Sequence, residues 1–141
     1  MSETIILGPI TLRFLHTKES TDASLDLFEM TVQPGGAMPV AHYHRDWDET
    51  IYGLSGTVTF VVGGRDLDLG PNQSVFIKRG VVHAFSNRTD RPASSLCVLT
   101  PGRLGPQFFR EIAALAAAGR PDPALMRETM LRHGLVPVAP A

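Results

Sequence analysis

Short runs of apolar and β-branched residues, broken by turn residues every few positions, make up most of the chain from residue 9 to residue 100. Runs of this length, bounded by Gly, Pro, Asn or Asp, predict β-strands rather than helices. The predicted strands are ITLRFL (10–15), LDLFEMTV (25–32), ETIYGL (49–54), TVTFVV (57–62), RDLDL (65–69), SVFI (74–77), HAFSN (83–87) and SSLCVLT (94–100), together with the histidine segment at 42–44. A series of about nine short strands predicts an all-β fold, built as a closed or nearly closed double sheet.

Turns rich in glycine and polar residues separate these strands. The pair Gly63-Gly64 is a strong hairpin signal, because glycine reaches positive φ without a Cβ penalty. Further turns are expected at Ser55-Gly56, at Lys78-Arg79-Gly80 and in RTDRP (88–92). The strands should therefore follow one another as an antiparallel meander.

The pattern changes after Pro101, where two segments have the spacing of short helices. The first is GPQFFREIAALAAAG (105–119), which has apolar residues three and four apart and a glycine at its end. The second is DPALMRETMLRHG (122–134), which begins with an N-cap residue and a proline and ends with a glycine. The positions that carry these signals are Phe108, Ile112, Leu115 and Gly119 in the first segment and Asp122, Pro123 and Gly134 in the second.

Two helices in series also raise the possibility of a DNA-binding helix-turn-helix. Residues 103–141 contain five Arg against the three acids Glu111, Asp122 and Glu128, a net charge of only +2. Because so small a charge provides little attraction for phosphates, covering of the barrel or contact in a dimer is the favoured role of these helices.

Composition narrows the classes of partner. The chain has 141 residues, 43% of them hydrophobic and 19% charged, and a formal net charge of −1. Such a chain is one domain of ordinary size, spanning 1–141, with no apolar run long enough for a membrane and no field that attracts nucleic acid. Cys97 is the single cysteine, and the N-terminus has no secretion signal. We therefore expect a cytoplasmic protein whose partner is a small molecule.

The segment AHYHRDWDET (41–50) contains candidate metal ligands. Residues two apart on a strand face the same side, so His42 and His44 should present both imidazoles to one surface. Glu49 is an odd number of residues away from both histidines, so on a straight strand its side chain would face the opposite side. A bend in the chain is needed to bring it to the histidines, and the segment RDWDE can supply one. His83 belongs to the same meander and can add a third imidazole. Three imidazoles and a carboxylate suit a borderline divalent ion.

Each of these residues also has an ordinary structural explanation. A His-x-His pair is frequently a polar decoration of a strand, and His83 taken alone is frequently a satisfied buried histidine. Asp46 and Asp48 fit turn positions, although either is a possible replacement for Glu49 in a coordination shell. His16 and His133 have no partners at ligand spacing and are interpreted as structural.

The frame around the histidines resembles the first motif of the cupin family, Gly-x5-His-x-His-x(3,4)-Glu-x6-Gly. Gly36, His42, His44, Glu49 and Gly56 match every specified position.

The second cupin motif, Gly-x5-Pro-x-Gly-x2-His-x3-Asn, is matched in part by Gly80, His83 and Asn87. Two departures occur: Lys78 stands where the motif has proline, and Asn72-Gln73 stands where it has a Gly-Asp turn. Both lie in turns around the strand 74–77, so they bear on the shape of that turn and of the pocket rim more than on the metal.

The resemblance covers residues 24–100 and implies a double-stranded antiparallel β-barrel, or jelly roll, with the two helices as a C-terminal extension at about 104–135. It implies that His42, His44, Glu49 and His83 hold one divalent metal ion in the mouth of the barrel. The resemblance leaves the metal open among Fe, Mn, Ni, Cu and Zn, and it implies a homodimer.

Three functions are compatible with such a site. The first is a quercetinase-like dioxygenase acting on a hydroxyaromatic or enolisable substrate, with Glu49 as both ligand and general base. The second is a metal-dependent isomerase or epimerase of a sugar or keto acid, and the third is a non-catalytic ligand-binding module. The side chains considered for an apolar pocket wall, with ordinary core as the alternative, are Phe60, Phe76 and Phe85, and Tyr43, Trp47 and Tyr52 are weaker candidates for substrate contact.

Overall fold

A computed structural model describes residues 2–38, 40–119 and 122–138 of the chain. The two ends of the predicted domain, at residue 1 and at 139–141, lie outside the described residues. The elements, in chain order, are β1 (Glu3–Leu7), β2 (Ile10–His16), β3 (Asp26–Val32), β4 (His42–His44), β5 (Asp48–Ser55), β6 (Val58–Val62), β7 (Arg65–Leu69), β8 (Ser74–Ile77), β9 (His83–Ser86), β10 (Ala93–Thr100), α1 (Gln107–Ala117), α2 (Pro123–Arg132) and β11 (Leu135–Pro137). Every predicted strand and both predicted helices are present, while β1 and β11 fall outside the predicted set.

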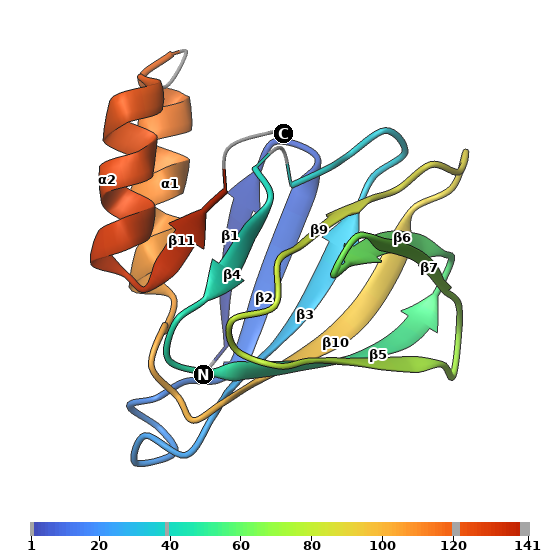
Figure 1. Cartoon of the computed structure of the whole chain (residues 1–141), viewed down its shortest axis with the longest axis horizontal. Coiled ribbons are helices and arrows are strands. Elements are labelled where there is room, and N and C mark those ends of the chain that lie inside the picture. Colours follow the sequence, from blue (N-terminus) through green and yellow to red (C-terminus); the bar gives the residue numbers. More distant parts are fainter. Residues whose placement is uncertain (1, 39, 120–121, 139–141) are drawn as a thin grey trace.

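The strands form two antiparallel sheets that face each other (Figure 1). One sheet has six strands in the order β1-β2-β3-β10-β5-β8, and the other has five in the order β11-β4-β9-β6-β7. The predicted all-β jelly-roll architecture with two C-terminal helices is confirmed. Among the described strands, hydrogen bonding does not join the two sheets into one continuous barrel. The expected antiparallel meander is wrong, because β3 pairs with β10 and β4 with β9, so many neighbours within a sheet are distant in sequence.

Side chains that alternate between buried and more exposed positions along the strands form the core between the sheets. In β3, Phe28, Met30 and Val32 are buried while the residues between them are half-buried. In the neighbouring β10, Cys97 and Leu99 point inward in the same way. Since successive side chains of a strand face opposite sides, one face of each strand lines the interior of the double sheet.

The C-terminal extension covers one end of the double sheet, beside β1, β4 and β11 (Figure 1). Arg110 of α1 forms an ion pair with Glu3 of β1 at 2.6 Å. Glu111 of α1 accepts hydrogen bonds from Arg132 at 2.7 Å and from His133 at 2.5 Å, which ties α1 to the end of α2. The expectation that the helices cover the barrel therefore agrees with their position, and the structural interpretation of His133 fits its contacts.

The connection from β10 to α1 is anchored in the core by Asp26. Its buried carboxylate accepts the backbone N–H of Lys18 at 2.7 Å and that of Gly105 at 3.0 Å. A Cβ atom at Gly102 would lie 2.8 Å from the carbonyl oxygen of Leu25, so the chain passes this point too closely for a side chain. These contacts set the direction in which α1 begins.

The departure from the second cupin motif at Asn72 has a simple structural explanation. Asn72 adopts a φ of +65°, a left-handed conformation that glycine favours and that Asn tolerates better than other residues. Its side chain also accepts a hydrogen bond from the hydroxyl of Tyr52 at 2.9 Å. The turn before β8 therefore keeps its shape without glycine.

No helix among the described residues combines the length and the apolar character that a membrane crossing requires.

Candidate metal centre

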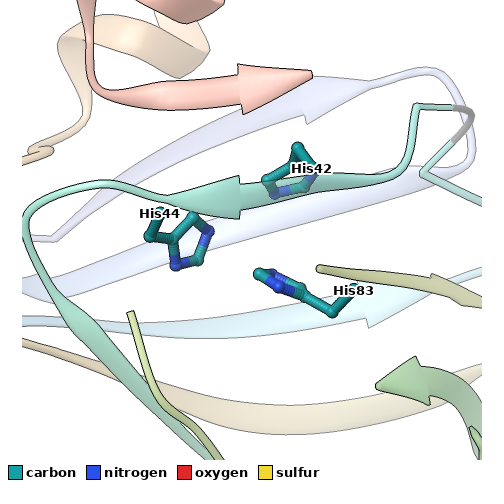
Figure 2. Close-up of side chains that lie close together, drawn as sticks. All are labelled: His42, His44 and His83. Carbon is teal, nitrogen blue, oxygen red and sulfur yellow. The ribbon is translucent and has the colours of Figure 1, made fainter. Parts of the chain in front are cut away.

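Three histidine side chains point toward one another in the space between the two sheets (Figure 2). His42 and His44 lie on β4 and share a face, as their spacing predicts, and His83 on β9 is the direct cross-strand neighbour of His42. The ring centroids are 4.6–5.2 Å apart, and the potential ligand atoms all lie within 4.8 Å of one another. The three histidines form a group that could hold a metal ion.

Hydrogen bonds orient two of the three rings. Nδ1 of His42 lies 2.9 Å from the carbonyl oxygen of Val40, and Nδ1 of His83 lies 3.0 Å from that of Val81. A carbonyl only accepts, so Nδ1 carries the hydrogen in both neutral rings and the lone pair of Nε2 remains free. This is the arrangement that metal-binding histidines usually show.

His44 is held instead by stacking and by the C-terminal strand. The ring of Trp47 lies 4.8 Å from that of His44 at an interplanar angle of 25°. Trp47 also meets Gly134, where a Cβ atom would come within 2.9 Å of the indole. Leu135 of β11 pairs with His44 in the sheet, so the C-terminal extension supports this ligand directly. The indole Nε1 of Trp47 is the one buried side-chain polar atom without a hydrogen-bond partner in the part of the chain that the structure describes.

Burial keeps all three histidines neutral. Desolvation, with repulsion from His83 as the second cause, lowers the pKa of His42 to about 4. The same causes, with His42 adding to the repulsion, lower the pKa of His44 to about 2. Desolvation also lowers the pKa of His83. The rings therefore present uncharged nitrogen donors at neutral pH, the form in which imidazole binds metals.

Glu49 lies next to this group, at the start of β5 in the opposite sheet. Its Oε1 is 3.7 Å from Nε2 of His83 and 3.8 Å from Nδ1 of His44. The turn between β4 and β5 supplies the bend that the parity of Glu49 requires. Burial raises the pKa of Glu49 to about 7, and a hydrogen bond with the thiol of Cys97 opposes this effect.

The aspartates near Glu49 are engaged elsewhere. Asp48 accepts hydrogen bonds from the backbone N–H of Arg79 at 2.9 Å and from its guanidinium at 3.1 Å. Asp46 pairs with Arg45 at 3.0 Å. The alternative in which either aspartate replaces Glu49 beside the histidines is therefore wrong, because Asp48 is tied to the turn before β9 and Asp46 to its neighbour at the surface.

A cavity of about 70 Å³ lies against the histidines and Glu49. Of the predicted wall residues, Phe60 and Phe85 line it, whereas Phe76 points outward from β8 and is 58% exposed. The prediction for Phe76 is wrong, because its position on β8 faces away from the interior. Tyr52 is exposed on the outer face, as strand alternation predicts, and Trp47 lies behind His44 rather than at the cavity.

The cavity also has walls that sequence reasoning did not assign to the site. Leu104, Phe108, Phe109 and Leu135 of the C-terminal extension line it. The helical spacing of Phe108 indicated a buried face, but nothing in the sequence indicated that this face closes the metal cavity.

Comparison with known proteins identifies the family. A model described as a cupin domain matches residues 28–99. Quercetin 2,3-dioxygenase of Bacillus subtilis (strain 168) is 28% identical over 109 residues, covering 77% of this chain and 31% of that protein. Tetracenomycin polyketide synthase protein TcmJ of Streptomyces glaucescens is 29% identical over 90 residues, covering 63% of this chain and 60% of that protein. The chain thus spans less than two thirds of the length of both relatives.

Among solved structures, the polyketide cyclase RemF of Streptomyces resistomycificus superposes with a TM-score of 0.62 at 27% sequence identity. The match covers 70% of this chain and 73% of RemF. The fold of this chain is therefore that of a known structural family.

Proposed function

This chain belongs to the cupin family, and we propose that it is a metal-dependent dioxygenase acting on a small hydroxyaromatic or enolisable substrate. The observation that carries the proposal is the meeting of three neutral, buried imidazoles and one half-buried carboxylate at an otherwise apolar cavity. We propose that the barrel core, at about 24–100, and the extension, at about 104–135, act as one domain spanning 1–141.

The donor set suits a divalent ion of borderline character. Three uncharged imidazoles with one carboxylate fit Fe, Mn, Ni, Cu or Zn. We propose that His42, His44, His83 and Glu49 hold this ion. When bound, a redox-active ion at such a site supplies the means to bring substrate and dioxygen into reaction.

Glu49 is proposed to act as the general base as well as a ligand. A base works best when its pKa lies near the working pH, and burial raises the pKa of Glu49 to about 7. We propose that its carboxylate, 3.8 Å from Nδ1 of His44 and 3.7 Å from Nε2 of His83, takes the hydroxyl proton of a bound substrate. The resulting anion would lie next to the cation site, while the surrounding Leu and Phe side chains exclude water.

The two relatives point to different chemistries. Quercetin 2,3-dioxygenase is an oxygen-consuming enzyme by name, but the chain matches only 31% of it. RemF is a polyketide cyclase and matches over a larger share of its length. A redox-neutral cyclisation or isomerisation of an enolisable substrate, with the ion as Lewis acid, is therefore the second candidate. A non-catalytic ligand-binding module is the third.

Metal content and oxygen uptake distinguish the candidates. We expect near-stoichiometric Fe, Mn, Ni or Cu in protein purified without a His-tag or chelator, measured by mass spectrometry. We also expect oxygen uptake with a simple diketone at an oxygen electrode. Zn with conversion of substrate but no oxygen uptake would favour the redox-neutral candidate. Bound metal without turnover of any substrate would favour the non-catalytic ligand-binding module.

We also propose that the protein is a cytoplasmic homodimer. Cys97 is buried and unpaired, in keeping with a reducing compartment. Tyr52 and Leu54 of β5 and Phe76 of β8 form an exposed apolar strip on the outer face of the six-stranded sheet, at 40%, 42% and 58% exposure. Two such strips can pack face to face.

Replacement of Phe76 by Glu should therefore produce a monomer, because it places a charge in the proposed interface. Light scattering after size-exclusion chromatography should give twice the chain mass of 15.3 kDa for the wild type and the single-chain mass for the variant. Ile6→Glu, an equally exposed apolar position on the distant edge strand β1, should remain dimeric. A monomeric wild type would contradict the dimer.

A further inference from the structure

The polar groups of the cavity are all at one end. Apart from His42, His44, Glu49 and His83, the described residues that line the cavity are all Leu, Ile, Met or Phe. No Lys or Arg lines it among those residues. A phosphate or a chain of hydroxyl groups placed here would lose its water without gaining partners, which is unfavourable. The lining therefore suits a substrate whose oxygen atoms all lie at the metal end.

The cavity is also small. Its volume of about 70 Å³ is below the roughly 150 Å³ of an apolar cavity that accommodates benzene. We expect a single ring to enter with adjustment of the walls, and a second fused ring to collide with a wall side chain. Which wall residue sets the limit depends on how firmly each one is held.

Most of the wall is part of the rigid core. Leu12, Phe60 and Leu99 lie on hydrogen-bonded strands and are at most 2% exposed. The half-buried apolar lining residues are Leu7, Met38, Phe85 and Phe109. Among them Phe109 is the one on α1, in the extension that covers the end of the double sheet. Its ring lies 5.8 Å from both Phe14 and Phe28, so it completes an aromatic cluster at the edge of the cavity.

We propose that the pocket selects a compact substrate, with its oxygen donors at one end and a single-ring apolar body, and that Phe109 sets this size limit. The inference rests on the proposed metal site and adds the substrate class. Phe109 lies outside residues 28–99, the part that matches the family model, so the size limit comes from the C-terminal extension of this chain.

Two aromatic diols that differ only in size test this inference. Catechol and 2,3-dihydroxynaphthalene present the same pair of oxygen atoms, but the second carries an additional fused ring. Dissociation constants are measured by following the visible spectrum of the Co²⁺-loaded protein. The wild type should bind catechol more tightly by at least about tenfold, because overpacking a rigid pocket is costly. The larger apolar area of the naphthalene would by itself favour the opposite order.

Phe109→Ala should remove this preference. The variant should gain affinity for 2,3-dihydroxynaphthalene by at least about tenfold, with little change for catechol, since truncation removes one ring from the wall. Phe109→Leu should fall between the two. The matched control is Leu131→Ala on α2, an exposed side chain of the same extension that does not line the cavity, and it should keep the wild-type ratio.

The outcomes separate this inference from the proposed function. A wild type that binds both diols equally, or a Phe109→Ala variant with an unchanged ratio, overturns the size limit even if oxygen uptake is observed. Selective diol binding without turnover supports the size limit and overturns the dioxygenase. A protein that takes up no Co²⁺ overturns both.

Discussion

A variant with both His42 and His44 replaced by Ala should fold but retain no stoichiometric metal. The two imidazoles are two of the three members of the histidine group, and neither belongs to the hydrophobic core cluster. Loss of an outer partner of a metal ligand already reduces affinity by about 10- to 100-fold, so loss of two direct ligands should exceed this range. Mass spectrometry measures the metal content, and circular dichroism verifies the fold. Full metal occupancy in the variant would show that the ion is bound elsewhere.

The acid stability of the metal-free proteins provides an independent control. In the folded chain burial lowers the pKa of His42 from 6.5 to about 4, so between these values the unfolded chain binds a proton that the folded chain does not. The stability contributed by His42 is therefore lost as the pH falls through this window, and His44 behaves in the same way. The raised pKa of Glu49 acts in the opposite direction, and Glu49 is present in both proteins. The melting temperature of the double variant should thus fall less than that of the wild type between pH 6.5 and pH 4.

Glu49→Gln should abolish most turnover while weakening metal binding less than the loss of a histidine does. The amide keeps the size of the side chain and an oxygen donor but cannot accept a proton. Removal of a general base typically lowers the rate by about 100-fold or more. Steady-state oxygen uptake and metal titration measure the two effects separately.

The pH profile distinguishes the base from a purely structural residue. Burial raises the pKa of Glu49, whereas a cation bound beside it lowers that pKa. A general base must be deprotonated to act, so the wild-type rate should fall toward acid pH as Glu49 takes up a proton, and the residual rate of Glu49→Gln should lack this dependence. Ligation by Glu49 also requires release of its proton, so calorimetry at pH 6 in buffers of different ionisation enthalpy should detect one proton fewer in the variant.

Asp48→Asn is the matched control for Glu49→Gln. It makes the same acid-to-amide change one residue earlier, at a side chain bound to Arg79 rather than to the cavity. Its rate and its proton release should equal those of the wild type. An unimpaired rate in Glu49→Gln would reject the role as base, and unchanged proton release would reject the role as ligand.

The strands, the helices and the histidine positions were predictable because they depend on local patterns. Alternating apolar residues define strands, Asp122 and Pro123 start α2, and the spacing of His42 and His44 places both rings on one face. The two motifs also extend the prediction to His83 and Glu49, although only as a resemblance. These features can be predicted without knowledge of the tertiary fold, because residues close together in the sequence determine them.

Other properties of the site depend on residues that are distant in sequence. The pKa of Glu49 is raised because the double sheet buries its carboxyl, and no local pattern encodes that burial. The prediction for Phe76 was wrong because alternation of apolar and polar residues identifies the two faces of a strand but not which face points inward. Phe109 and Leu135 reach the cavity only because α1 and β11 fold back over the end of the sheets. Local spacing thus determines which groups are available to the site, whereas burial and the closing of the cavity arise from long-range packing.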